Sequence, residues 1–492
     1  MAAAGTPAAT DAADAGPVSG STDGSVSTAE IRLGPPTPDV APVTTSSVMT
    51  GVPWTFMLLA GIAALTVGLF GVTTAVYAGV VLINAVFLVF FLRHVAFAAA
   101  AARWAQRDLF ETPDLAVEYS PNVTVMVACH NEEAVVASLV RGLVALHYPR
   151  SRLEVIVVDD GSTDRTGALL DQHTAGLRHF TVIHRAPGEG GGKSGALNTA
   201  LEQARGEVIV IFDADHIPRR NVIGRLVRHF HDPRVGAVQG RCIVRNSVHS
   251  TLARSIAIDY FSGYLVNEYG RQALFGMPAY GGANCAIRAA SLRRLGGWNP
   301  NSVTEDTDIT MRLALAGERV RYDISAVDTE EGATTLDRFI KQRYRWARGH
   351  QQVWRDYRRH VWDSNFLSLI EKIETTLFLL VYHVPVFCAI TIFLTVLRLF
   401  GIGPHVSVFE MLPLASLLFA GPFCELAVGL LVGRAPRRAA WSVAWMTPLF
   451  VVFMFVCTRA WIDGVLGREY AWVKTKRSQW SALDGREDGE LV

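Results

Sequence analysis

Residues 207–215 read EVIVIFDAD, and this stretch decides the fold. A short, continuous apolar run of this kind is typical of a strand buried on both faces. It ends in the D-x-D pair Asp213 and Asp215. A second run, residues 153–160 (LEVIVVDD), also ends in two acids. Ligands of parallel sheets bind beyond the carboxyl ends of the strands, so these acidic ends predict a ligand site.

Around these two runs, short apolar strands alternate with amphipathic helices over a domain expected to span residues 101–365. Such alternation predicts an α/β domain with a mostly parallel sheet and crossover helices. The predicted strands are residues 123–128, 153–158, 180–184 and 207–212, and the predicted helices are residues 132–146, 165–172 and 194–204.

The composition indicates a membrane protein that carries a water-facing domain. Half of the 492 residues are hydrophobic and only 18% are charged. The net charge of +1 gives no general attraction to nucleic acid, so no nucleic-acid partner is expected. The six cysteines have no C-x-x-C spacing, so the spacing supports neither a zinc site nor a disulfide framework.

The N-terminal region is expected to contain a disordered tail followed by two membrane helices. Residues 1–50 are rich in small and polar residues and lack an apolar period, and they do not resemble an ordinary secretory signal. Residues 51–100 begin with a charge-free run that can hold two spans, near 54–72 and 75–92. The arginines that follow favour the cytoplasm.

The C-terminal region, residues 366–465, is expected to hold three or four membrane segments. Three apolar runs are visible, at 375–397, 408–432 and 439–458. Three crossings would leave residues 466–492 outside the cell, but the basic residues of this tail favour the cytoplasm. A re-entrant or hidden segment is therefore expected, in a multi-pass plasma-membrane protein with a cytoplasmic catalytic domain.

The acids at the strand ends suggest two different tasks. Asp159 and Asp160 precede a tight Gly161 turn, where a carboxylate could accept a hydrogen bond from a nucleobase, although an ordinary cap and turn would look the same. Asp213 and Asp215 can converge where the strand gives way to a turn. Their oxygens suit a hard cation such as Mg²⁺ or Mn²⁺, which would neutralise a departing diphosphate.

A glycine-rich loop at residues 188–194 (GEGGGKS) opens a helix. It is not a P-loop, because Pro187 stands where that motif requires glycine. Glycines and a lysine at the start of a helix nevertheless suit an anion, so Lys193 is expected to contact a diphosphate.

Two later motifs supply a base and a phosphate-binding face. Glu305 and Asp306 begin a helix, where acids are also favoured simply by the helix dipole; Glu305 is assigned to substrate binding and Asp306 to general-base catalysis. The Q-x-x-R-W motif holds Gln342 and Arg345, which can bind phosphate oxygens, and Trp346, on which a sugar ring can stack. A basic helix lying on the membrane surface is compatible with the same residues.

Two further features lie outside these motifs. Residues 280–284 (YGGAN) allow close backbone approach and are interpreted as an acceptor lining. Glu425 lies within an apolar run, where an acid lines a sugar channel, pairs with a neighbour or lies near an interface. These alternatives for Glu425 stay open.

In this order, D-D-G, D-x-D, T-E-D and Q-x-x-R-W resemble the motifs of the processive family-two glycosyltransferases, which include cellulose, chitin, hyaluronan and poly-N-acetylglucosamine synthases. Residues 127–133 (VACHNEE) and 192–198 (GKSGALN) share the resemblance, which covers roughly residues 50–480. It implies a glycosyltransferase A-type domain inserted between N- and C-terminal membrane helices.

The resemblance also implies roles. A UDP-sugar, with UDP-N-acetylglucosamine preferred, would bind at Asp159, Asp160 and Lys193, and the metal at Asp213 and Asp215. Asp306 would deprotonate the acceptor, a growing polysaccharide that is extruded through the bilayer. Residues 472–477 (WVKTKR) resemble a gating segment, and an accessory secretion or regulatory subunit is left open.

Three other functions are compatible with part of this pattern. A UDP-glucose-using β-glucan synthase would carry the same motifs. A non-processive enzyme that adds one sugar to a lipid shares the acidic set and Q-x-x-R-W. A transporter with a nucleotide-sensing domain would leave Asp306 and Trp346 without a role.

Overall fold

The computed structural model describes residues 52–110, 119–401, 408–435 and 439–468. The predicted tail of residues 1–50 and the predicted gating segment at 472–477 lie outside the described residues.

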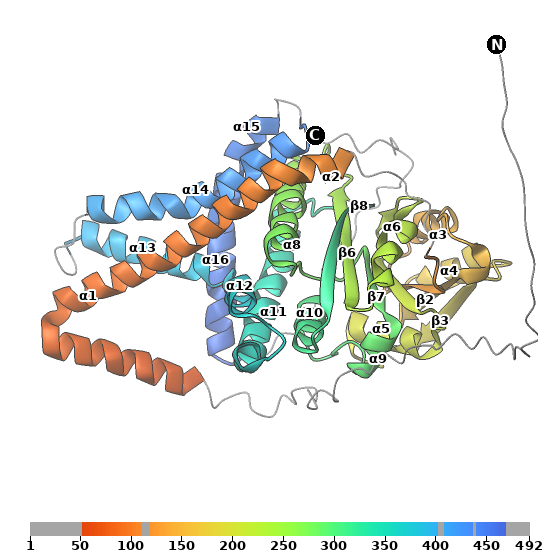
Figure 1. Ribbon diagram of the computed structural model, residues 1–492, viewed down its shortest axis with the longest axis horizontal. Helices are drawn as coiled ribbons and strands as arrows, with labels where there is room; N and C mark the ends of the chain where they lie inside the picture. The colour runs from red at the N-terminus through yellow and green to blue at the C-terminus, as the bar shows by residue number, and fades with distance from the viewer. Residues whose placement is uncertain (1–51, 111–118, 402–407, 436–438, 469–492) are drawn as a thin grey trace, which may run out of the picture. The chain divides into compact units, whose positions relative to one another are not determined.

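The centre of the fold is one eight-stranded sheet with the strand order β3-β2-β1-β4-β7-β6-β8-β5 (Figure 1). Four of the seven neighbouring pairs are parallel, because β7 and β5 run against their neighbours. The strands are β1 Val123–Cys129, β2 Leu153–Asp160, β3 Phe180–Arg185, β4 Val208–Asp213, β5 Ile217–Pro218, β6 Val235–Val244, β7 Cys285–Arg288 and β8 Arg319–Glu330.

The four strands expected from the sequence are confirmed, with ends shifted by one or two residues. β1 lies between β2 and β4, and all three run in parallel. Their register pairs Cys129 with Asp159 and Ala128 with Asp213, so the acidic ends of β2 and β4 lie at one edge of the sheet. The other four strands, β5 to β8, were not predicted from the sequence.

Helices cover both faces of the sheet. Residues 123, 125 and 127 of β1 belong to one apolar core with α3, α4 and α6, whereas Met126 belongs to the core with α5, α9 and α10. This alternation follows from the two-residue period of a strand. The helices that cover the sheet are α3 Val136–Val144, α4 Thr166–Thr174, α5 Gly192–Gln203, α6 Val222–Val227, α9 Ala289–Arg294 and α10 Glu305–Leu315.

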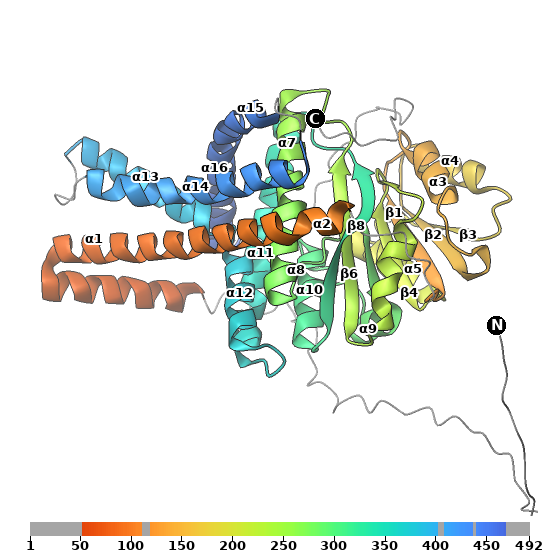
Figure 2. The same cartoon turned by 45° about the horizontal axis from the view of Figure 1, so that its top comes forward.

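The remaining helices form the apolar part of the molecule and its junction with the sheet domain. They are α1 Val52–Ala100, α2 Gln106–Phe110, α7 Thr251–Ser262, α8 Tyr269–Phe275, α11 Leu336–Asp363, α12 Leu369–Leu380, α13 Val384–Leu399, α14 Val408–Val432, α15 Ala439–Ala444 and α16 Met446–Val465. Short π-helical turns occupy Ala101–Ala105 and Gly263–Glu268, and 3₁₀ turns occupy Arg150–Arg152 and Arg228–His231. α1 packs along α14, and α16 packs against α11 and α13 (Figures 1 and 2).

The break in α1 falls at Gly71, whose φ of 83° is favoured by glycine, and not between the predicted spans 54–72 and 75–92. Among the described residues, Tyr77–Leu109 and Met446–Val465 are each long and apolar enough to cross a bilayer. Leu369–Leu380 and Val384–Val396 meet the same condition only as a pair, which is bent by 59°. The number of crossings stays a prediction.

Candidate active site

Lys193 joins motifs that are far apart in the sequence. It lies in the first turn of α5, and its Nζ is 2.6 Å from Asp213 Oδ1 at the end of β4. The same Nζ is 3.2 Å from Glu305 Oε1 at the start of α10, and it donates to Gly282 O at 3.0 Å. Burial opposes the charged form, but Asp213 and Glu305 outweigh it and raise the pKa of Lys193. The lysine is therefore a fixed cation between the D-x-D and T-E-D motifs.

These residues open into one cavity of about 590 Å³, a size typical of ligand sites. Most of the residues predicted from the sequence line it, namely Asp160, Lys193, Asp213, Glu305, Asp306, Gln342, Arg345 and Trp346. Asp159 and Asp215 are not among the lining residues.

The two acids that end β2 face different surroundings. Asp159 is buried, and its carboxylate accepts from the Ser162 N–H at 3.2 Å and from His184 Nδ1 at 3.1 Å. Asp160 lines the cavity and forms an ion pair with Arg185 of β3. Burial raises the pKa of Asp160, and Arg185 opposes this shift. The geometry of Asp159 is that of a turn cap, and its predicted contact with substrate stays a prediction.

The D-x-D motif offers oxygen ligands for a cation. Carboxyl oxygens of Asp213 and Asp215 and a ring nitrogen of His216 lie within 4.8 Å of one another. Both His216 nitrogens already face acids, since Nδ1 contacts Asp328 and Nε2 is 3.0 Å from Glu330 Oε2. The two aspartates are thus the ligands that this arrangement offers, and paired carboxylates fit Mg²⁺ or Mn²⁺ together with phosphate oxygens.

Asp306 has the electrostatics of a proton acceptor. Burial, followed by repulsion from Glu305, raises its pKa to about 6. Lys193 and Arg345 pull the pKa down, and so does the Thr307 N–H, which donates to Asp306 Oδ1 at 2.6 Å. Among the described residues, no hydrogen-bond donor is directed at Asp306 Oδ2. One carboxyl oxygen is therefore held by hydrogen bonds, while the other has no such partner among the described residues.

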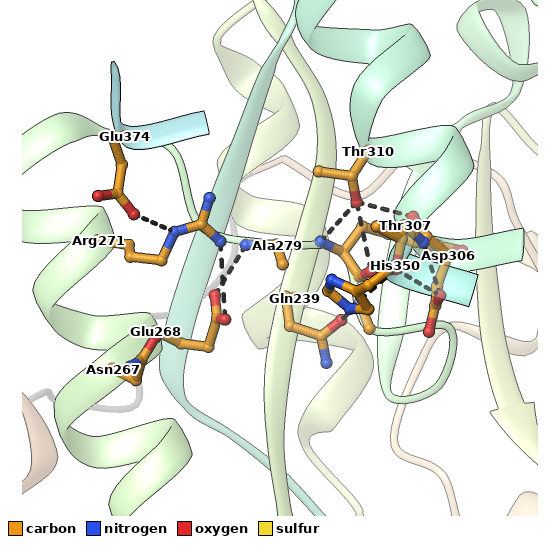
Figure 3. A network of polar contacts seen from close by, with 12 residues as sticks. Gln239, Asn267, Glu268, Arg271, Ala279, Asp306, Thr307, Thr310, His350 and Glu374 are labelled. Atoms are coloured by element: carbon orange, nitrogen blue, oxygen red, sulfur yellow. Dashed lines mark hydrogen bonds and ion pairs between the residues drawn. The ribbon is translucent and has the colours of Figure 1, made fainter. Parts of the chain in front are cut away.

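Behind Asp306 lies a short polar chain, drawn in Figure 3. The Thr307 hydroxyl contacts Asp306 Oδ1 at 3.2 Å and His350 Nε2 at 3.4 Å. Burial lowers the pKa of His350 to about 3, so this ring is neutral. This series of hydrogen bonds adds no charge to the site, and it orients the Asp306 carboxylate. Thr304 occupies the N-cap position of α10, but its side chain makes no capping hydrogen bond.

α11 carries the Q-x-x-R-W motif to this site by packing tightly on the start of α10. A Cβ at Gly349 would lie 2.2 Å from Thr304 Cγ2, so glycine is required for this approach. Gln342 Oε1 is buried and accepts no hydrogen bond from the described residues. Arg345 has no ion pair among those residues, although its charge acts on Asp306. Both line the cavity, and their predicted contact with phosphate oxygens stays a prediction.

The Trp346 ring has two close partners. The Arg343 guanidinium lies 4.4 Å from the centre of its ring, and the Tyr260 ring lies 6.2 Å away at a 30° tilt. Tyr260, Tyr264, Tyr280 and Tyr382 also line the cavity. An aromatic wall of this kind suits the apolar faces of sugar rings.

The predicted acceptor lining at residues 280–284 is held by a side chain that the sequence did not single out. Gln239 of β6 accepts from the Gly281 N–H at 2.6 Å and donates to Ala283 O at 3.0 Å. At the start of the same loop, the Ala279 N–H donates to Glu268 at 2.7 Å (Figure 3). No local pattern around Gln239 distinguishes it, because its partners are more than 40 residues away.

Glu425 of α14 lines the far end of the same cavity and is paired as well. Its carboxylate is 2.8 Å from His94 Nδ1 of α1 and 3.4 Å from Asn267 Nδ2. The alternative that Glu425 pairs with a neighbour is therefore confirmed, and its place along a sugar channel stays a prediction. The cavity extends from the acidic motifs of the sheet domain to the apolar helices α1 and α14.

These features define a class: an α/β domain whose cavity is lined by carboxylates at a strand end and at a helix start, together with a lysine, an arginine and a side-chain amide. Residues 121–349 match the family described as "Glycosyltransferase like family 2". This stretch is therefore similar to the family-two glycosyltransferases.

Curated relatives agree over the same region. The chain is 36% identical over 235 residues to the probable glycosyltransferase YdaM of Bacillus subtilis, which covers 47% of this chain and 56% of the relative. It is 37% identical over 255 residues to a beta-monoglucosyldiacylglycerol synthase of Synechocystis, covering 51% and 52% of the two chains. It is 30% identical over 254 residues to a poly-beta-1,6-N-acetyl-D-glucosamine synthase of Staphylococcus aureus, covering 51% and 60%. The matched region thus spans between half and two thirds of each relative.

A solved structure confirms the fold. The mannosyltransferase PcManGT from Pyrobaculum calidifontis, in complex with GDP-Man and Mn²⁺, superimposes with a TM-score of 0.54 at 24% identity. The match covers 79% of this chain and all of that chain.

Proposed function

We propose that this protein is a metal-dependent, inverting hexosyltransferase of the cell membrane. It transfers a sugar from a UDP-sugar, with UDP-N-acetylglucosamine as the first candidate, to a growing β-linked polysaccharide. The observation that carries this proposal is the single cavity that joins Lys193, Asp213 and Asp306 to a wall of aromatic residues and to helices of the apolar part. A nucleotide-sugar is expected at the acidic end and the acceptor along the aromatic wall.

In the proposed reaction, Asp306 Oδ2 takes the proton of the acceptor hydroxyl. The hydroxyl oxygen then forms a bond to the anomeric carbon from the side opposite the diphosphate. The bond from that carbon to the diphosphate oxygen breaks, and UDP leaves with the electron pair. Attack from the opposite side inverts the anomeric configuration. A general base of this kind typically contributes 10²–10⁴-fold to the rate.

The donor end stabilises the leaving diphosphate. A divalent cation held by Asp213 and Asp215 would supply Lewis-acid neutralisation of the phosphate oxygens. Arg345 offers a bidentate guanidinium and Gln342 a side-chain amide to the same group. Lys193 would exchange part of its contact with Asp213 for the diphosphate.

The topology follows from the same arrangement. The proposal places the sheet domain in the cytoplasm, where UDP-sugars are made, and extrudes the product past the helices around Glu425. Two spans are available in the described residues, and the bent pair at residues 369–396 supplies a third or a re-entrant segment. An accessory secretion or regulatory subunit is compatible with this arrangement but has no support in it.

A second candidate is transfer of one sugar to a lipid hydroxyl. It is favoured by the 37% identity to a beta-monoglucosyldiacylglycerol synthase. The apolar residues Leu426 and Phe450 at the far end of the cavity would then contact the acyl chains.

One experiment separates these candidates. The purified full-length protein is incubated with radiolabelled UDP-N-acetylglucosamine, UDP-glucose, UDP-glucuronate or GDP-mannose, with Mg²⁺ or Mn²⁺ and membrane lipid. A ladder or high polymer with UDP release supports the polysaccharide synthase, and a single lipid-linked sugar supports the second candidate. Absence of nucleotide release from every donor would reject both.

The rate is expected to depend on pH through Asp306. The carboxylate form accepts the proton, and a pKa of about 6 means that this form is lost as the pH falls below about 6. The value of kcat/KM for the acceptor should decline about tenfold for each further pH unit. Initial rates between about pH 5 and pH 8 test this, with donor binding measured at each pH as the control. A flat profile with constant donor binding would contradict the assignment.

Trp346→Ala is expected to raise the acceptor KM about 5–10-fold, because removing a stacking face costs about 1 kcal/mol. Donor affinity should change little. Trp362→Ala is the matched control, since Trp362 lies on the same helix but is exposed away from the cavity. Normal acceptor kinetics in Trp346→Ala would remove the stacking role.

A further inference from the structure

Beside the D-x-D turn lies a second group of metal-ligating atoms that the proposed reaction does not use. One ligand atom each of His216, Cys242 and Glu330 lies within 4.8 Å of the others. The candidate donors are Cys242 Sγ, a Glu330 carboxyl oxygen and His216 Nε2, which a metal would take over from its ion pair with Glu330. His216 and Cys242 are buried, and all three residues line the cavity. Cysteine sulfur is a soft ligand that Mg²⁺ does not favour, so the chemistry differs from that of Asp213 and Asp215.

The sheet itself assembles this group. β6 and β8 are parallel neighbours, and their register places Cys242 opposite Asp328. Glu330 follows Asp328 by two residues, so both side chains point to the same face of β8. β5 pairs with the other edge of β8 with Ile217 opposite Thr329, which brings the preceding His216 next to Glu330. β6 and β8 thus present one donor each, and the residue just before β5 presents the third.

The orientation of His216 is set by Asp328. The carboxylate of Asp328 accepts a hydrogen bond from Nδ1, which directs Nε2 toward Glu330 at 3.0 Å. In metal sites, a carboxylate on the outer nitrogen of a histidine fixes the ring and makes the inner nitrogen a better ligand. Asp328 is entirely buried and lies in this position.

We propose that His216 Nε2, Cys242 Sγ and Glu330 bind a transition-metal dication of the Zn²⁺ class. A nitrogen, a sulfur and a carboxylate oxygen, with one position left toward the cavity, match three-ligand zinc sites. Binding releases two protons, one from Nε2 and one from the thiol, because the ligating forms are neutral imidazole and thiolate. His216 directly follows Asp215 in the sequence. A metal bound at His216 would therefore also influence the geometry of the D-x-D turn.

The three ligands lie 26 and 88 residues apart along the chain, since they are residues 216, 242 and 330. No spacing motif joins them, which is why the cysteine pattern supported no zinc site. This proposal does not depend on the proposed sugar transfer, because the test below uses no sugar donor and no acceptor.

The test is Co²⁺ binding to the purified full-length protein in excess Mg²⁺, which occupies oxygen-only sites. One Co²⁺ per chain is expected, with a sulfur-to-cobalt charge-transfer band that added Zn²⁺ removes. Cys242→Ser should abolish the band, and Cys285→Ser should retain it. Cys285 is the matched control because it is equally buried in the same sheet and belongs to no such group among the described residues.

Two further variants keep the thiol in place and guard against a folding defect in Cys242→Ser. Glu330→Gln should weaken Zn²⁺ binding, and Asp328→Asn should weaken it roughly 10–100-fold. Two outcomes would overturn the proposal: Co²⁺ binding by the native protein without a sulfur-to-cobalt band, or a band that persists in Cys242→Ser. Either would mean that His216 is only ion-paired and that the Cys242 thiol binds no metal.

Discussion

Asp306→Asn is expected to lower the rate of sugar transfer about 10²–10⁴-fold while donor affinity stays near normal. The amide oxygen can still accept from the Thr307 N–H, which is 2.6 Å from the carboxylate, so the start of α10 should keep its shape. An amide cannot take the acceptor proton. The measurements are initial rates of UDP release and the Kd of the UDP-sugar by calorimetry.

The matched control for this change is Asp337→Asn. Asp337 is an exposed acid on α11 that pairs with Lys341 at 2.8 Å, outside the cavity. Its variant should retain normal rates. If Asp306→Asn retained near-normal rates with an intact fold, another group would have to be the base and the proposed mechanism would be wrong.

Asp215→Asn is expected to reduce turnover by about 10²–10³-fold, because loss of a metal ligand removes several kcal/mol of charge stabilisation. Asp215 is 3% exposed, and its carboxylate accepts from the Glu331 N–H at 3.3 Å. The amide oxygen can make the same bond, so the turn should persist. Unlike Asp306→Asn, this variant should lose affinity for Mn²⁺ and, with it, for the donor.

Titration of Mn²⁺ into each variant distinguishes the two roles. Asp215→Asn should need a higher Mn²⁺ concentration for half-maximal rate, whereas Asp306→Asn should not. Asp232→Asn, at a partly exposed acid paired with Arg234, serves as the control. An unchanged Mn²⁺ requirement in Asp215→Asn would argue against this aspartate as a ligand.

The site could be predicted in part because its motifs are local. The acids at the ends of β2 and β4 could be recognised because they directly follow apolar runs. Parallel pairing then brings the ends of these strands to one edge of the sheet. Arg185, Gln239 and His350 were missed because each acts on a partner far away in sequence. The orientation of Asp159 toward His184 was missed for the same reason, because the carboxylate belongs to β2 and the imidazole ring to β3.

The sequence by itself determined strands β1 to β4 and the acidic ends of two of them, and it showed apolar runs of membrane-spanning length, whose number of crossings stays a prediction. These depend on hydrophobic period and run length, which are properties of neighbouring residues. Only the tertiary structure decided that Lys193 bridges Asp213 and Glu305, that one cavity reaches Glu425, and that His216, Cys242 and Glu330 share a face. Such contacts depend on strand order and register. Long-range packing determines both, and no local sequence pattern predicts them.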